Sequence, residues 1–209
     1  MGSRTLQCEV LVLTRGEPRE SCTPYMLLCP EAGVLSALQR RGRGAGGPSL
    51  DLFDSASLHL SGDDSGGPWF VKEAQVTARR PGIAARYEAL DLAGRLTTLI
   101  ARNPLPEDGR GGIHALASRA LDAFASHPAQ AECVYIKACF SLARDEGYPV
   151  RQQWMAELHG ALREEAEHIL ASPVSELARQ PGINAAAARL LPRLEHWIRE
   201  HTDLHFGRA

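Results

Sequence analysis

The chain has 209 residues, 44% of them hydrophobic and 23% charged, which is typical of a folded globular protein and excludes a disordered one. Its formal net charge is −2, so any nucleic-acid site must be a local basic patch rather than a property of the whole surface. No apolar run approaches the roughly 20 residues that span a bilayer, and the first residues lack the apolar core of a signal peptide, so we expect a cytoplasmic protein with no membrane partner.

Short β-strands are predicted throughout residues 1–80. Apolar runs bounded by Gly, Pro and charged residues indicate strands, and alternation of apolar and polar residues indicates a strand with one buried face. These patterns occur at 9–13, 25–29, 34–38, 50–60 and 69–77. Five short antiparallel strands predict a small barrel of the OB type.

After Arg80-Pro81-Gly82 the pattern changes to apolar residues at three- and four-residue spacing, which predicts helices. The predicted helices cover 83–102, 113–126, 129–147, 151–171 and 185–203. Strands followed by helices indicate an α+β chain. We therefore expect an N-terminal five-stranded OB-fold-type barrel at 1–80, followed by an all-helical C-terminal domain at 81–209.

The cysteines are odd in number and lie in apolar segments, at Cys8, Cys22, Cys29, Cys133 and Cys139. No pair has Cys-x-x-Cys spacing, so the sequence predicts reduced core thiols rather than disulfides or a metal knuckle. We expect no metal and no cofactor.

The order of these segments resembles the RecO family. The resemblance begins with the strand at 9–13 and its Arg/Gly/Glu turn, and continues through the acidic-Gly hairpin within 27–38. Arg40-Arg41-Gly42-Arg43-Gly44 stands where the family carries an Arg/Lys-rich loop. The further similar segments are 69–76, 84–102, 140–148 and 190–201.

This resemblance implies a bacterial recombination mediator, cytoplasmic and associated with the nucleoid when active. Such a protein binds single- and double-stranded DNA, anneals complementary strands, and loads the RecA recombinase together with RecR and single-strand-binding protein. Many members carry four zinc-binding cysteines after the Gly147-Tyr148 position, whereas residues 149–154 contain none. The resemblance is thus to a zinc-less member, and no catalytic residue is expected because annealing breaks no bond.

Basic residues of the first 80 positions are the candidate DNA contacts. Arginine forks in a Gly-rich loop suit phosphate contact. The candidates are Arg40, Arg41 and Arg43, extended by Arg15, Arg19, Lys72, Arg79 and Arg80. The alternative is a solvated surface rich in arginine, since residues 1–82 hold equal numbers of basic and acidic residues. Tyr25, Phe53, Trp69 and Phe70 are candidates for base stacking, or core aromatics; adjacent Trp69 and Phe70 must point to opposite faces.

The helical part of a RecO protein holds a groove for the acidic, apolar C-terminal tail of single-strand-binding protein. Cations beside an apolar pocket have the chemistry for such a tail. Arg119, Lys137, Phe140 and Arg144 are the candidates, with structural salt bridges as the alternative role.

Three other motifs are interpreted as having no catalytic or cofactor role. Gly62-Asp63-Asp64-Ser65-Gly66-Gly67-Pro68 is similar to a serine-protease nucleophile loop, but only His59 precedes Ser65. Glu165-Ala166-Glu167-His168 is a single Glu-x-x-His, whereas a di-iron bundle needs two. No helix pattern follows Gly42-x-Gly44-x-Gly46. The alternative functions are a protein-interaction scaffold without DNA binding and, less favoured, a serine hydrolase acting through Ser65.

Overall fold

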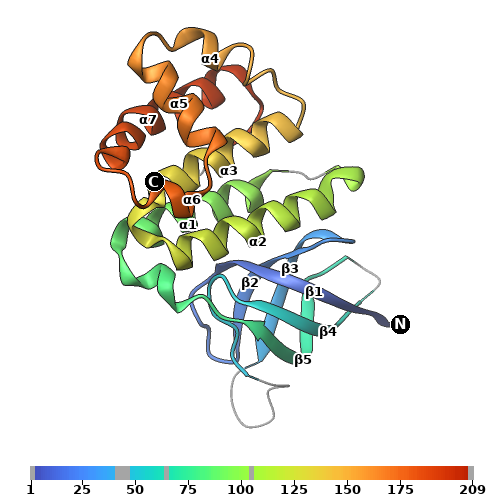
Figure 1. Cartoon of the computed structure of the whole chain (residues 1–209). Helices are drawn as coiled ribbons and strands as arrows, with labels where there is room; N and C mark the ends of the chain where they lie inside the picture. Colours follow the sequence, from blue (N-terminus) through green and yellow to red (C-terminus); the bar gives the residue numbers. More distant parts are fainter. Residues whose placement is uncertain (1–2, 41–47, 64–65, 104–105, 207–209) are drawn as a thin grey trace. The chain divides into compact units, whose positions relative to one another are not determined.

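The structure is a computed structural model that describes residues 3–40, 48–63, 66–103 and 106–206 (Figure 1). The chain divides into two compact units, each made of two separate stretches. The barrel unit comprises Met1–Arg80 and Pro104–Ala115, and the helical unit comprises Pro81–Asn103 and Leu116–Ala209.

Five strands form a closed barrel in the order β1-β2-β3-β5-β4. The strands are β1 (Ser3–Arg15), β2 (Cys22–Cys29), β3 (Gly33–Arg40), β4 (Ser55–Asp63) and β5 (Trp69–Ala78). Neighbouring strands pair antiparallel except β3 and β5, which pair in parallel, with Ala37 opposite Trp69. The expected fold class, a five-stranded OB-like barrel followed by helices, is confirmed.

The core of the barrel follows from the two-residue period of its strands. Every second side chain points inward, so apolar residues at alternating positions fill the space that the closed sheet surrounds. This core comprises Cys8, Val10, Val12, Tyr25, Leu27, Cys29, Ala37, Leu50, Ala56, Leu58, Leu60, Val71 and Ala74. All five cysteines are free thiols, and burial raises the pKa of Cys8 to about 12.

The stretch before β4 differs from the prediction, which placed a strand over 50–60. Residues 50–54 form a loop against β1, where Val12 N donates to Asp54 O at 2.9 Å and Phe53 N donates to Val12 O at 3.1 Å. Phe53 has a φ of 67°, in the left-handed region that ends regular strand geometry. Apolar alternation at 50, 52 and 56 therefore predicted a strand that begins five residues too early.

The second stretch of the barrel unit is held to the β2–β3 hairpin. Arg110, the first residue of α2 (Arg110–Ser126), donates from Nη1 to Glu31 O at 3.3 Å. Its side chain lies against Gly33, where an added Cβ would meet Arg110 Nε at 3.0 Å. Gly33 also has a φ of 74°, so a glycine suits both the hairpin turn and this contact. The segment 106–115 thus belongs to the barrel unit through the hairpin of Gly33.

The remaining helices are α1 (Tyr87–Arg102), α3 (Ala131–Asp145), α4 (Trp154–Glu157), α5 (Ala161–Ala171), α6 (Val174–Leu177) and α7 (Ile183–His201). Three short 3₁₀ turns lie at Pro81–Ala85, Glu107–Gly109 and Pro128–Gln130. In the helical unit α3 packs against α1, α5 and α7, and ten of its residues are buried. The helix α3 is therefore the centre of the helical core.

The predicted single helix over 151–171 is wrong. The helix α4 ends at Glu157, Leu158 is extended with a ψ of 133°, and Gly160 has a φ of 55° before α5 begins. Leu158 remains buried, so apolar residues keep their helical spacing across the break. The sequence pattern therefore gave no sign that the helix ends there. No helix among the described residues is long and apolar enough to cross a membrane.

A buried carboxylate joins three helices of the helical unit. Glu195 of α7 is 5% exposed and accepts a hydrogen bond from Tyr135 Oη of α3 at 2.9 Å. It also pairs with Arg95 of α1, and with Arg199 one turn along α7 at 3.3 Å. Burial of Tyr135 raises its pKa, so the phenol stays protonated and donates to the carboxylate.

Candidate functional site

Two of the candidate basic residues of the barrel unit, Arg15 and Arg40, lie toward one end of the barrel. Because β1 and β3 run opposite to β2 and β4, the end of β1, the start of β2 and the end of β3 lie together. Arg15 is opposite Tyr25 and Arg40 is opposite Cys22, so these arginines flank the first half of β2 on either side. Their guanidinium groups are exposed, which suits contact with a ligand at this end.

Lys72 joins this group through the parallel pairing of β3 and β5. Gln39 is opposite Val71, so the next residues along the two strands, Arg40 and Lys72, are neighbours. Both side chains are exposed, and no ion pair is found for either within the described part of the chain. We call Arg15, Arg19, Arg40 and Lys72 the basic rim.

Arg15, the last residue of β1, and Arg19, in the β1–β2 loop, both have bonds within the barrel unit. Arg15 Nη1 lies 3.3 Å from Asp51 Oδ1, in a pair whose side chains are 36% and 60% exposed. An exposed pair of this kind is weak, so Arg15 can exchange Asp51 for a phosphate at small cost. Arg19 N donates to Cys22 O at 2.8 Å, which shapes the loop.

Arg41 and Arg43 lie outside the described residues, as do Ser65 of the protease-like loop and Gly42, Gly44 and Gly46. Their predicted contact with DNA stays a prediction. Arg40, the last residue of β3, is the part of that loop motif that the structure positions.

Arg80 corrects the sequence-based expectation of a surface cation. It is 8% exposed, and its Nη1 donates to Phe53 O at 2.6 Å and to Ser55 Oγ at 3.0 Å. Its guanidinium therefore holds the 50–54 loop against the start of β4. Arg79 beside it is exposed and favours the charged form of Asp54, whose pKa is raised chiefly by burial.

The four candidate stacking aromatics divide into core and surface. Tyr25 and Phe53 are buried, and Tyr25 Oη donates to Leu50 O at 3.0 Å, so neither ring is open to a base. Trp69 is half-buried under the Arg4 guanidinium, 4.3 Å from the ring centroid. Phe70 is 36% exposed, as expected for a neighbour that points to the opposite face. Phe70, two residues before Lys72, is the aromatic best placed to stack.

Acidic residues lie on the outer face of the same barrel. Glu9 on β1, Asp63 on β4 and Glu73 on β5 are exposed, and Glu73 is opposite His59. The outer surface of β1, β4 and β5 therefore carries negative charge as well as the positive charge of the basic rim.

The helical unit brings three of the four predicted partner-binding residues to one pocket. Lys137, Phe140 and Arg144 on α3 line a cavity of about 420 Å³ together with Arg151, Met155, Arg163 and residues of α5. Phe140 packs against Trp154, with ring centroids 6.0 Å apart. Arg144 pairs with Asp145 at 2.7 Å and Arg163 with Glu167 at 3.0 Å. We call this cavity the α3–α5 pocket.

Lys137 is bound within the fold rather than open to a partner. Its Nζ donates to Ile169 O at 2.9 Å, Leu170 O at 2.8 Å and Ser172 O at 3.0 Å. These carbonyls lie at the C-terminal end of α5, where a helix leaves its last carbonyls without intrahelical amide donors. Burial lowers the pKa of Lys137. The expected role as a partner-facing cation is thus replaced by a capping role for α5.

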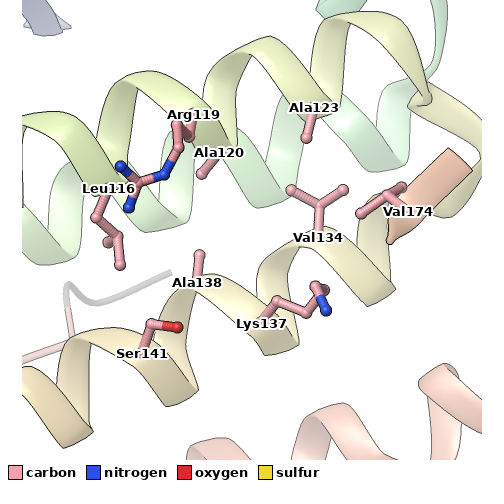
Figure 2. Close-up of a pocket in the computed structure, with 9 residues that line it drawn as sticks. All are labelled: Leu116, Arg119, Ala120, Ala123, Val134, Lys137, Ala138, Ser141 and Val174. Carbon is pink, nitrogen blue, oxygen red and sulfur yellow. The ribbon is translucent and has the colours of Figure 1, made fainter. Parts of the chain in front are cut away.

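Arg119 lies at a different, smaller pocket of about 180 Å³ (Figure 2). Residues of α2 face residues of α3 across it, with Val174 of α6 at one end. Its small side chains are Ala120, Ala123, Ala138 and Ser141. Arg119 projects from α2 at the edge of this pocket, so it does not share the α3–α5 pocket with Phe140 and Arg144.

Arg151 and Arg163 also line the α3–α5 pocket, although the sequence did not single them out. Arg151 is exposed and precedes α4, and Arg163 lies on α5. Both are distant in sequence from the α3 cluster, and no spacing rule connects them to Phe140. A count of the cations between 137 and 163 was the one signal that could have included them.

The residues that the structure describes contain no cluster of three or more side chains that could hold a metal ion. Glu165 binds Arg189 through both oxygens at 2.7 and 2.8 Å, and His168 Nε2 lies 2.6 Å from Gln180 Oε1. Glu165 and His168 of the Glu-x-x-His motif are therefore each bonded to a side chain from outside α5, Arg189 of α7 and Gln180.

Comparison with known proteins adds no relative. The sequence matches no protein-family model, and no curated protein is significantly similar to it.

Proposed function

We propose that this protein is a RecO-like recombination mediator that binds single- and double-stranded DNA through its barrel unit. The observation that carries the proposal is the closed barrel with strand order β1-β2-β3-β5-β4 and parallel β3–β5 pairing, followed by a helical part. OB-type barrels bind nucleic acids along the β2–β3 face and the β1–β2 loop. Arg40 of the basic rim is on β3 and Arg19 is in that loop, while Arg15 and Lys72 are on the neighbouring strands β1 and β5.

The mechanism is charge neutralisation and strand alignment without bond chemistry. Arg15, Arg19, Arg40 and Lys72 contact phosphates, and Phe70 stacks on a base. Two strands whose phosphates are neutralised approach without mutual repulsion, so complementary bases pair. This mechanism requires neither a catalytic residue nor a cofactor, and the proposed location is the bacterial cytoplasm, at the nucleoid.

The helical unit is the proposed partner-binding part, for RecR and for the C-terminal tail of single-strand-binding protein. The α3–α5 pocket supports the second partner, because apolar Phe140 and Met155 lie beside Arg144, Arg151 and Arg163. An acidic tail with an apolar end meets both kinds of group there.

A protein-interaction scaffold without DNA binding is the second candidate. Exposed Glu9, Asp63 and Glu73 on the barrel and a net charge of −2 favour it. On this proposal the α3–α5 pocket still binds its acidic peptide.

The experiment that separates the two is fluorescence anisotropy of labelled single-stranded DNA at several salt concentrations. We expect affinity to fall with salt, and the Arg40→Ala/Lys72→Ala variant to show a smaller log–log slope, by about 0.7 for each phosphate that is no longer neutralised. The matched control is Arg179→Ala/Arg193→Ala, which removes two exposed arginines from the helical unit.

Equal slopes for the two variants would contradict a site at the basic rim. No binding even at low salt would overturn the mediator proposal and leave the scaffold, which is then measured with a labelled acidic tail peptide against the Arg151→Ala variant.

A further inference from the structure

The segment that follows α7 belongs to no helix or strand and is hydrogen-bonded to the helical unit. Thr202 ends the helix, with a φ of −137° and a ψ of 161°, and its Oγ1 donates to Ile198 O at 2.7 Å. Leu204 N in turn donates to Thr202 Oγ1 at 3.2 Å. These bonds turn the chain out of the helix, and we call residues 202–206 the strap.

Asn103 binds one peptide unit of the strap with both ends of its amide. His205 N donates to Asn103 Oδ1 at 2.8 Å, and Asn103 Nδ2 donates to His205 O at 3.2 Å. Asn103 is 7% exposed and extended, directly after α1, and its Nδ2 is also bound to Leu99 O at 2.6 Å. The buried Asn103 amide is thus held by Leu99 O in the orientation in which it binds the backbone of the strap.

Tyr148 supplies a second contact of the same kind. Its hydroxyl accepts a hydrogen bond from Asp203 N at 3.2 Å, two residues before His205. In an extended chain the backbone amides of residues i and i+2 point to the same side. Tyr148 and Asn103 therefore bind the same edge of the strap, through Asp203 N and His205 N. This is how an extended peptide is bound at the edge of a sheet, with side chains here in place of the sheet.

Two side chains of the strap contribute little to this binding. Asp203 and His205 are exposed, and neither side chain has a bond with the body of the helical unit in the described part of the chain. Leu204 and Phe206 are half-buried, and the Phe206 ring centroid lies 4.7 Å from the Arg199 guanidinium. The site therefore selects an extended backbone followed by an aromatic residue rather than a particular sequence.

We propose that Asn103, Tyr148 and Arg199 form a binding site for an extended peptide, and that the strap occupies it as an intramolecular ligand. Another extended chain with an aromatic residue after the bound peptide unit takes the same hydrogen bonds once the strap leaves. The strap follows α7 directly, so its effective concentration at the site is high and it excludes weak ligands. This inference is independent of DNA binding.

The test uses the full chain and a labelled peptide with the sequence of residues 202–209. The Asp203→Pro/His205→Pro variant removes the two amide donors of the strap while leaving Asn103 and Tyr148 in place. We expect the peptide to bind this variant at least roughly ten-fold more tightly than it binds the unaltered chain, whose site is occupied. Anisotropy measures the binding, and circular dichroism checks that the helices are retained.

Two matched controls separate backbone recognition from simple stickiness. A peptide with the same two prolines should not bind, whereas a His205→Ala peptide should bind as well as the original. Adding Asn103→Ala to the open variant should abolish binding. Should the folded double-proline variant bind the peptide no better than the unaltered chain, or bind the proline peptide equally well, the inference is overturned.

If the double-proline variant does not fold, hydrogen exchange of the unaltered chain and of the Tyr148→Phe variant tests the inference instead. Peptides covering 203–206 should exchange faster in the Tyr148→Phe variant while α3 is unchanged. Unchanged exchange of the strap in that variant would also overturn the inference.

Discussion

The barrel unit and the helical unit both bury charged residues, but they bond them to different parts of the fold. In the barrel unit buried Asp54 and Arg80 are bonded within the stretch 51–55 or to it, whereas Arg15, Arg40 and Lys72 remain at the surface. In the helical unit Glu195 and Lys137 lie inside or half-inside the fold and are bonded to it. A buried or half-buried basic residue is thus bonded to backbone carbonyls in both units, at Arg80 in the barrel and at Lys137 among the helices, and contact of Lys137 with a partner stays a prediction.

The largest effect is expected at Glu195. Replacing it by alanine leaves Tyr135 Oη buried without a partner and separates α7 from Arg95. We expect the free energy of unfolding to fall by about 2–4 kcal/mol, measured by urea denaturation.

The matched control for this change is Glu165→Ala, which removes a half-buried carboxylate, 30% exposed, that joins α5 to α7 through Arg189. A loss of less than about 1 kcal/mol is expected there. If both variants lost equal stability, burial of the carboxylate would not be what distinguishes the helical core.

A smaller loss is expected for Lys137→Met, which keeps the apolar stem and removes the ammonium group from the three carbonyls at the end of α5. We expect about 1–2 kcal/mol, again by urea denaturation. Arg119→Met on α2 is the control and should stay within about 0.5 kcal/mol of the unaltered chain. If Lys137→Met left the free energy of unfolding unchanged, the Lys137 ammonium would again be a candidate for contact with a partner.

The smallest effect concerns the barrel unit and pH. Burial lowers the pKa of His114, opposed by Glu31 and Glu9 and assisted by Arg80. The folded pKa thus lies below the unfolded value near 6.5, so the unfolded state takes up a proton more readily. Stability should be constant above about pH 7.5 and should decline as the pH falls through about 6.5 toward the folded pKa.

The measurement is urea denaturation at about pH 7.5, 6.5 and 5.5, with His114→Gln as the comparison. The variant should lose the part of the pH dependence that His114 contributes. An identical pH profile for both proteins would show that His114 is not the group that titrates.

The order and type of the elements could be predicted because burial imposes a period on the sequence. The strands predicted at 25–29, 34–38 and 69–77, the first two from apolar runs bounded by turn residues, are found with boundaries close to those of β2, β3 and β5. The break between α4 and α5 was missed because Leu158 stays buried outside a helix, so the apolar spacing is unbroken.

The roles of the charged residues were predicted less well. Apart from Arg199, which pairs with Glu195 one turn along α7, the partners of Arg80, Lys137 and Glu195 lie between 25 and 100 residues away, and no local pattern encodes such a distance. Asn103 also looked like an ordinary helix end before Pro104. Its sequence neighbours gave no sign that its amide binds His205.

The separation of the barrel unit into two stretches affects how the protein is made. During synthesis the five strands emerge first, yet Arg110, which holds the β2–β3 hairpin through Glu31 O, emerges only after the whole of α1. A gene fragment that ends after β5 therefore encodes every strand and still lacks part of the barrel unit. The two units are interleaved in the gene, so neither can be exchanged between proteins by a single cut.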